Sequence, residues 1–215
     1  MSERLFRLFR PAHNLSNDTG LVVLLHGIGS NEEDLFSLAG SIDPRFAVAA
    51  IRAPYPYAMG GYAWFSIEWT STSLIRDVEQ GRSSLTWITE EVRLLTEEAG
   101  VPPERVVIGG FSQGAIMSLT LLLNQPDLVG GALLMSGAVF PELAPTPRHI
   151  GPKPVLVQHG VFDPILNVEL GREVKAVLDQ FGIEPDYREY RMAHEVSWES
   201  LQDARAWLAA FLDRS

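Results

Sequence analysis

The chain has 215 residues, which fits one ordinary α/β domain, and 46% of them are hydrophobic, enough to bury a sizeable core. Seventeen Lys and Arg against 27 Asp and Glu give a formal net charge of −10, which opposes binding to nucleic acid and to anionic membrane surfaces. Cysteine is absent, which excludes a disulfide framework, a thiol nucleophile and a cysteine-based zinc site.

The first residues and the apolar runs of the sequence do not match the patterns of a signal peptide or of a membrane span. The first ten residues, MSERLFRLFR, alternate charged and apolar side chains and lack the continuous apolar core of a signal peptide. The most apolar run, residues 130–140, is too short to cross a bilayer. We therefore expect a cytoplasmic location and no stable insertion into a membrane.

Short apolar runs alternate with helical patterns along the chain. Strands are expected at residues 21–25, 46–54, 105–110, 128–137, 153–160 and 185–192. Helices are expected at residues 31–42, about 75–99, 112–125, 168–182 and 198–214. Continuous apolar strands separated by helices are typical of βαβ units, in which helices cover both faces of a mostly parallel sheet. We therefore expect a single α/β domain over residues 1–215, with loops at 55–73 and 141–153 lying over the sheet.

A lone serine stands between glycines where an expected strand turns into an expected helix. Gly110-Phe111-Ser112-Gln113-Gly114 matches the Gly-x-Ser-x-Gly pattern of a nucleophile elbow. A sharp turn forces the serine into an uncommon backbone conformation, and side chains two positions away on either side would collide with the neighbouring turn. The pattern alone also fits a glycine-rich turn with a capping serine. The apolar strand before it and the helix after it favour Ser112 as a nucleophile.

A nucleophilic serine needs a base to take its proton and a third group to orient that base. His194 lies in the short loop between the last expected strand and the last helix, at the carboxyl end of a strand, where sites in open parallel sheets gather. Asp163 follows the strand at 153–160 in the same way, although an aspartate before Pro164 also fits a simple turn. We expect His194 as the base and Asp163 as the acid, with Glu189 the first alternative for the acid.

The segment His26-Gly27-Ile28-Gly29 closes the first expected strand. Its glycines let the main chain approach a ligand and present N–H donors, so we expect the N–H groups of Ile28 and Gln113 to hold an oxyanion. His26 itself precedes the serine and is interpreted as structural. Ser30 and Glu33 have the spacing of a capping box, which predicts that a helix starts at Ser30.

Residues 55–65 are rich in aromatic side chains and form a candidate apolar wall for an acyl chain. The expected substrate-contacting residues are Met59, Tyr62, Trp64 and Phe65. The alternative is that part of this loop simply packs onto the sheet.

The blocks HGIGSNEEDL, GFSQGA, HGVFDPI and AHEVSWESL, in this order, resemble the phospholipase/carboxylesterase family of α/β-hydrolases, which includes the acyl-protein thioesterases. The resemblance implies a compact fold without a large cap domain and hydrolysis of carboxylic esters, thioesters or lysophospholipids. It implies no cofactor and no metal. Matched by motif, Ser112 is the nucleophile, Asp163 the orienting acid and His194 the base, while Ile28 and Gln113 supply the oxyanion hole.

Two positions depart from the family pattern. Ala193 stands where the family has glycine before the histidine, and Asn167 stands where it has proline after the acid. Neither departure removes a catalytic group, and both lie in loops that shape the substrate pocket. Trp64, by contrast, resembles the tryptophan that these enzymes have beside the site.

These observations predict a serine carboxylesterase that forms an acyl-enzyme on Ser112. The alternatives are a non-catalytic binding module with a hydrolase fold and a serine peptidase that cleaves small substrates. The resemblance also favours a homodimer. The acyl-chain length and the preference among ester, thioester and lysophospholipid are left open by the sequence.

Overall fold

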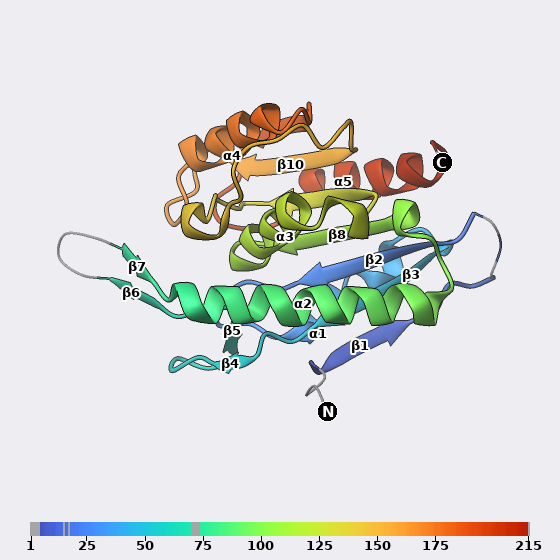
Figure 1. The fold of residues 1–215 in the computed structure, drawn as a ribbon, viewed down its shortest axis with the longest axis horizontal. Coiled ribbons are helices and arrows are strands. Elements are labelled where there is room, and N and C mark those ends of the chain that lie inside the picture. The colour runs from blue at the N-terminus through green and yellow to red at the C-terminus, as the bar shows by residue number, and fades with distance from the viewer. Residues whose placement is uncertain (1–4, 15, 17, 70–73, 215) are drawn as a thin grey trace.

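The computed structural model describes residues 5–14, 16, 18–69 and 74–214. Its centre is a seven-stranded sheet with the order β1-β3-β2-β8-β9-β10-β11 (Figure 1). Strand β1 pairs with β3 in antiparallel fashion, and the other neighbouring strands pair in parallel. The strands of this sheet are β1 (Arg7–Arg10), β2 (Gly20–Leu25), β3 (Phe46–Ile51), β8 (Val106–Phe111), β9 (Gly131–Met135), β10 (Val155–Gly160) and β11 (Asp186–Tyr190).

Helices cover both faces of the sheet. The α-helices are α1 (Glu32–Phe36), α2 (Val78–Ala99), α3 (Gln113–Asn124), α4 (Val168–Gln180) and α5 (Trp198–Leu212). In Figure 1, α2 and α3 lie in front of the sheet and α5 lies behind it. Short 3₁₀ turns lie at Ala39–Ser41, Pro103–Arg105, Pro126–Leu128 and Pro141–Leu143. The prediction of one α/β domain with a mostly parallel sheet and no large cap is confirmed.

The sheet separates two hydrophobic clusters. One contains side chains of α2, α3 and α4, and the other contains side chains of α1 and α5. Successive strand residues point to opposite faces, so Val22 belongs to the second cluster and Val23 to the first. Every residue of β2, β3, β9 and β10 is buried, which explains why these strands were visible in the sequence as continuous apolar runs.

The segment predicted as a loop at residues 55–73 contains short strands. Strand β4 (Tyr55–Pro56) pairs with β5 (Tyr62–Ala63), and β6 (Ile67–Trp69) pairs with β7 (Leu74–Arg76), both antiparallel. Part of the predicted loop, residues 70–73, lies outside the described residues. The β6–β7 pair projects beyond the sheet on the side where the parallel strands have their carboxyl ends (Figure 1).

Two predicted helix starts are wrong. Ile75 lies in β7, and helix α2 begins after Asp77, whose side chain accepts a hydrogen bond from the Gln80 N–H. Helix α1 is capped by Asn31, which accepts from the N–H of Glu33, and not by Ser30. The Ser30 hydroxyl instead donates to the Asp34 carboxylate at 2.8 Å. A capping box at Ser30 is therefore absent, and the helix begins one residue later.

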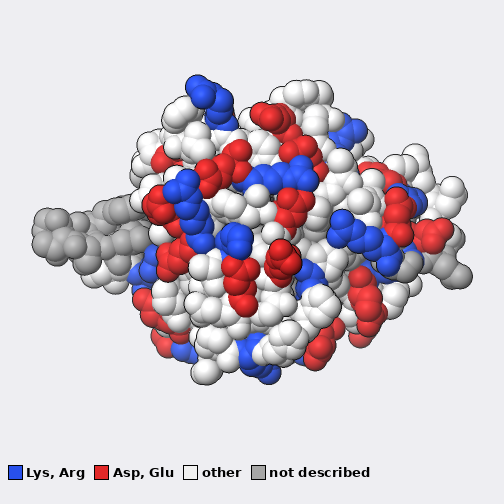
Figure 2. All heavy atoms as spheres, turned by 90° about the horizontal axis from the view of Figure 1, so that it is seen from above, with Lys and Arg blue, Asp and Glu red and all other residues white. Residues whose placement is uncertain are grey.

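The surface mixes charges of both signs. On the face in Figure 2, Lys and Arg side chains lie beside Asp and Glu side chains rather than in one broad patch of either sign. Ion pairs between exposed side chains include those of Arg172 with Glu189 and of Lys175 with Asp179. Among the helices that the structure describes, none is long and apolar enough to cross a membrane.

Candidate active site

Ser112 occupies a strained turn between β8 and α3. Its backbone angles are φ 54° and ψ −118°, which a non-glycine residue rarely adopts. A Cβ atom on Gly110 would overlap the backbone of Gly114, and one on Gly114 would overlap the carbonyl oxygen of Leu25. The steric reason given for the two glycines is thus confirmed. The Ser112 N–H donates to the carbonyl of Met135, which fastens the turn to β9.

Ser112, His194 and Asp163 form a continuous hydrogen-bonded series. The Nε2 atom of His194 lies 2.9 Å from Ser112 Oγ, and its Nδ1 atom lies 2.6 Å from Asp163 Oδ2. The other carboxylate oxygen, Asp163 Oδ1, accepts from the N–H groups of Ile165 and Leu166 at 2.9 and 2.8 Å. Both carboxylate oxygens are therefore held by hydrogen bonds. Since a carboxylate only accepts, the neutral His194 ring carries its hydrogen on Nδ1, and Nε2 accepts from the serine hydroxyl.

The three side chains meet because they follow strands of one parallel sheet. Ser112 follows β8, Asp163 follows β10 and His194 follows β11. The segment that carries the histidine rests on the end of β10, where a Cβ atom on Gly160 would overlap the carbonyl oxygens of Met192 and Ala193. Glycine at this position lets the loop close over the strand.

A buried histidine that sequence reasoning did not select lies behind the Asp163 carboxylate. The His159 ring is fully buried on β10, and its Nε2–H donates to the carbonyl of Leu166 at 2.7 Å. Helix α4 has glycine at the contact, since a Cβ atom on Gly171 would lie 2.6 Å from the His159 Nδ1 atom. His159 thus holds the loop whose N–H groups bind Asp163. Its position at the end of an apolar strand was the available signal.

The alternative acid, Glu189, lies elsewhere on β11. Its carboxylate accepts from Arg172 Nε at 2.8 Å and from the Tyr187 hydroxyl at 3.0 Å. The Arg172 hydrogen bond lowers the pKa of Glu189 below its ordinary value. Glu189 is engaged in a surface network, and the carboxylate that His194 contacts is that of Asp163.

The two N–H groups expected to hold an oxyanion are available. Gln113 is the first residue of α3, and the first N–H groups of a helix have no acceptor within it. Among the described residues, the Ile28 N–H has no hydrogen-bond acceptor. A Cβ atom on Gly27 would lie 3.3 Å from the Ser112 Cβ, so this turn passes directly against the serine. The next two N–H groups hold the turn in place: that of Gly29 donates to the Tyr62 carbonyl, and that of Ser30 donates to the Gly27 carbonyl.

His26 is a neutral structural residue in this arrangement. Its Nδ1 donates to the carbonyl of Gly27 at 2.7 Å, and its Nε2 accepts from the N–H of Ala53 at 3.0 Å. Burial lowers the pKa of His26 below its ordinary value. The geometry agrees with the structural interpretation made from the sequence.

Comparison with known proteins identifies the family. The family model described as Phospholipase/Carboxylesterase matches residues 12–212. The chain belongs to the phospholipase/carboxylesterase family. It is 29% identical to acyl-protein thioesterase 1 of Kluyveromyces lactis over 221 residues, covering 94% of each chain.

Solved structures agree. The esterase PE8 superposes with a TM-score of 0.83 at 25% identity, covering 97% of this chain and 99% of that one. The Bacillus cereus carboxylesterase shares the fold, with a TM-score of 0.85 at 21% identity over 98% of this chain and 96% of its own. The resemblance inferred from the four sequence blocks is confirmed, and the chain is a hydrolase of the esterase and thioesterase class.

Within this family member, Trp64 and Phe65 do not form a substrate wall. Neither side chain has exposed surface, and the Trp64 indole donates to the carbonyl of His26 at 2.9 Å. The Gln113 side chain accepts from the Trp64 N–H and donates to the Phe65 carbonyl, both at 2.7 Å. The expectation that these two aromatic residues contact substrate is corrected: they brace Gln113 and the turn at residues 26–28 from within the core.

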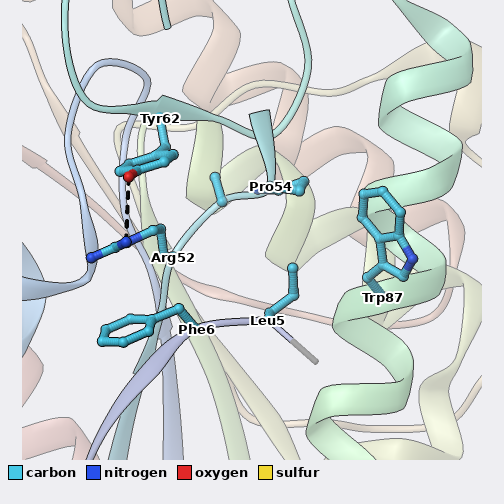
Figure 3. Close-up of a pocket in the computed structure, with 7 residues that line it drawn as sticks. Leu5, Phe6, Arg52, Pro54, Tyr62 and Trp87 are labelled. Atoms are coloured by element: carbon cyan, nitrogen blue, oxygen red, sulfur yellow. Dashed lines mark hydrogen bonds between the residues drawn. The ribbon is translucent and has the colours of Figure 1, made fainter. Parts of the chain in front are cut away.

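The other two expected contact residues lie apart from one another. Met59 is 86% exposed, on the turn that joins β4 to β5, and its contact with substrate stays a prediction. Tyr62 lines a cavity of about 250 Å³ with Leu5, Pro54 and Trp87, and its hydroxyl accepts from Arg52 at 3.3 Å (Figure 3). The Arg52 guanidinium also lies over the Tyr62 ring. The Tyr62 side chain thus faces this cavity, and its contact with substrate stays a prediction.

Asn167, one of the two departures from the family pattern, has a structural role of its own. Its side chain caps α4 by accepting from the N–H of Glu169 at 3.2 Å. Ala193, the other departure, donates its N–H to Glu195 at 3.4 Å. In the part of the chain that the structure describes, no group of three or more histidine and carboxylate side chains is arranged to hold a metal ion.

Proposed function

We propose that this family member is a serine carboxylesterase that hydrolyses carboxylic esters and thioesters through an acyl-enzyme on Ser112. The observation that carries the proposal is the unbroken hydrogen-bonded series from Asp163 through His194 to Ser112 on a strained turn. A nucleophile, a base and a group that orients the base are the minimum set for acyl transfer by serine.

The mechanism uses each group once in each half of the reaction. His194 Nε2 takes the Ser112 proton as Oγ attacks the carbonyl carbon, and the N–H groups of Ile28 and Gln113 hold the oxyanion. The imidazolium, stabilised by Asp163, then gives its proton to the leaving alcohol or thiol, and the acyl-enzyme forms. Water, deprotonated by His194, attacks the acyl-enzyme and releases the acid and the free serine.

Other functions receive less support. A non-catalytic binding module predicts a broken set of catalytic groups, and here all three are within hydrogen-bonding distance. No feature of the described residues favours a peptidase. The relatives named acyl-protein thioesterase support thioester substrates, whereas a lysophospholipid substrate rests on the family description alone. The cytoplasmic location and the homodimer stay predictions.

Replacing the nucleophile tests the proposal. Ser112→Ala should lower kcat/KM for 4-nitrophenyl butanoate by roughly 10⁴-fold or more, because the attacking oxygen is lost while the fold is kept. A fluorophosphonate probe should label the parent at Ser112 and should not label the variant. Ser118→Ala is the matched control, since Ser118 is also a buried serine, on α3, and bonds only to the Gly114 carbonyl.

The control should keep both activity and labelling. Activity of Ser112→Ala within a few-fold of the parent would contradict the proposal. Asp163→Asn keeps the size of the side chain but can present an N–H donor to His194 Nδ1, where the carboxylate accepts. This variant should also lose roughly 10⁴-fold in kcat.

A further inference from the structure

A groove of about 330 Å³ opens beside the proposed base. One wall comes from α1 and the residues after it, and includes Leu35 and Leu38. The other wall comes from Phe111, His194 and Val196. The rings of Phe111 and His194 are in contact, with centroids 4.8 Å apart. The groove therefore reaches the imidazole from the face of the sheet that α1 and α5 cover.

The chemistry of His194 says which part of a substrate belongs there. The base that takes the serine proton later gives it to the departing alcohol or thiol, so the leaving group must touch the imidazole. The acyl group stays attached to Ser112 during this step. A cavity walled by His194 is therefore placed to hold the leaving group rather than the acyl chain.

Resting on the proposed esterase function, we propose that this groove is the leaving-group subsite and that it selects alcohols and thiols that are uncharged or cationic over those that are anionic. The walls of the groove are apolar: Leu35 is buried, and Leu38, Phe111 and Val196 are half-buried and pack against the second hydrophobic cluster. Such walls suit a leaving group whose atoms next to the scissile bond are apolar.

Two carboxylates set the charge of the groove. Asp34 lies on the α1 side and Glu195 on the histidine side, and both are exposed. Asp34 accepts from the Ser30 hydroxyl and Glu195 from the Ala193 N–H. Among the described residues, no Lys or Arg forms an ion pair with either carboxylate. A negative leaving group is repelled from both sides and a positive one is attracted.

The size of the effect is set by solvent. Both carboxylates are exposed, so water and salt screen them, and each contributes a factor of a few to the rate rather than orders of magnitude. The preference is accordingly a ratio between substrates, strongest at low ionic strength, and it decreases as salt is added.

Three thioesters with one acyl group measure this preference. Butanoyl thiocholine has a cationic thiol, butanoyl 2-mercaptoethanol a neutral one and butanoyl mercaptoacetate an anionic one. In the double variant Asp34→Asn/Glu195→Gln, the ratio of kcat/KM for the cationic substrate to that for the anionic one should fall about five-fold relative to the parent. Comparing the two proteins cancels the intrinsic reactivity of each thiol.

Glu33→Gln/Glu199→Gln is the matched control. It changes the net charge by the same amount. Glu33 on α1 precedes Asp34, and Glu199 on α5 lies shortly after Glu195; both are exposed and neither lines the groove. Its ratio should equal that of the parent. An equal fall in both variants would overturn the proposal, because the preference would then come from the overall charge of the protein.

A second variant tests the space rather than the charge. Leu38→Trp should fill the groove and lower kcat/KM for benzyl butanoate about ten-fold relative to methyl butanoate, because only the benzyl group needs the room. An unchanged ratio in the double carboxylate variant would overturn the proposed subsite even if Leu38→Trp failed to fold.

Methyl butanoate separates the subsite proposal from the esterase proposal. Its hydrolysis by the parent supports a serine esterase whatever the groove binds. If the parent neither hydrolyses methyl butanoate nor is labelled at Ser112, the esterase proposal itself is contradicted.

Discussion

His26 illustrates how a single buried residue couples the fold to pH. Both ring nitrogens serve the backbone, because Nδ1 donates to the Gly27 carbonyl while Nε2 accepts from the Ala53 N–H. A proton on Nε2 would remove that acceptor and place a positive charge in the core, which is why burial lowers the pKa of His26 below 6.5. The folded protein therefore binds this proton less readily than the unfolded chain.

The free energy of unfolding should then decrease as the pH falls. Stability from His26 is fully present above pH 6.5, its ordinary pKa, and is lost on acidification until the pH reaches the lowered folded value. For one proton the slope approaches about 1.4 kcal/mol per pH unit. Urea unfolding at pH 7.5, 6.5 and 5.5 should show a shallower slope for His26→Gln than for the parent. Equal slopes would contradict a neutral buried His26.

At the scale of elements, the site depends on how a loop closes over a strand end. Gly160→Ala should push the segment that carries His194 away from β10, because the new methyl group would overlap the carbonyl oxygens of Met192 and Ala193. A displacement of about 1 Å between base and nucleophile costs about 10²-fold in kcat. Steady-state kinetics should show this loss while circular dichroism shows an unchanged fold.

Gly40→Ala is the control for that change, since nothing lies within 4 Å of a Cβ atom at Gly40. It should leave kcat within two-fold of the parent, as a roughly neutral surface substitution does. A Gly160→Ala enzyme as active as this control would show that the loop adapts without moving the histidine.

Elements formed from local signals were predictable from the sequence, and elements formed from distant pairing were not. Strands β2, β8 and β10 are the apolar runs that a buried parallel sheet requires, and Ser112 and Asp163 were selected as candidates by their places after two of these strands. Strand β1 is a half-buried edge strand, and the β6–β7 pair is short. Their existence depends on partners that the local pattern does not specify.

The same limit applies to parts of the site. An aromatic segment predicts apolar contact but not which side chains face a ligand. The Gln113 side chain, on the distant helix α3, bonds the main chain at Trp64 and Phe65, and the rings of both residues are buried in the core. The groove beside His194 joins α1 to a loop near the end of the chain. Only the packing of α1 and α5 on one face of the sheet brings these segments together.

At the scale of the whole molecule, the two hydrophobic clusters are coupled through the strands they share. Neighbouring residues of one strand contribute to opposite clusters, as Val22 and Val23 do in β2, so neither cluster can lose its strands while the other keeps them. The tryptophans report on both sides, because Trp64 lies in the cluster with α2 and α3, and Trp207 lies in the cluster with α1 and α5.

Unfolding in urea should therefore be a single cooperative transition over the whole chain, as expected of one domain. Midpoints from circular dichroism and from tryptophan fluorescence should coincide in the parent, and should coincide again in Trp207→Phe, which lacks the buried tryptophan of the cluster with α1 and α5. Trp207→Phe removes part of a buried ring, so both of its midpoints should shift together to lower urea. A fluorescence transition that separates from circular dichroism in one protein and not in the other would show that the two faces of the sheet unfold independently.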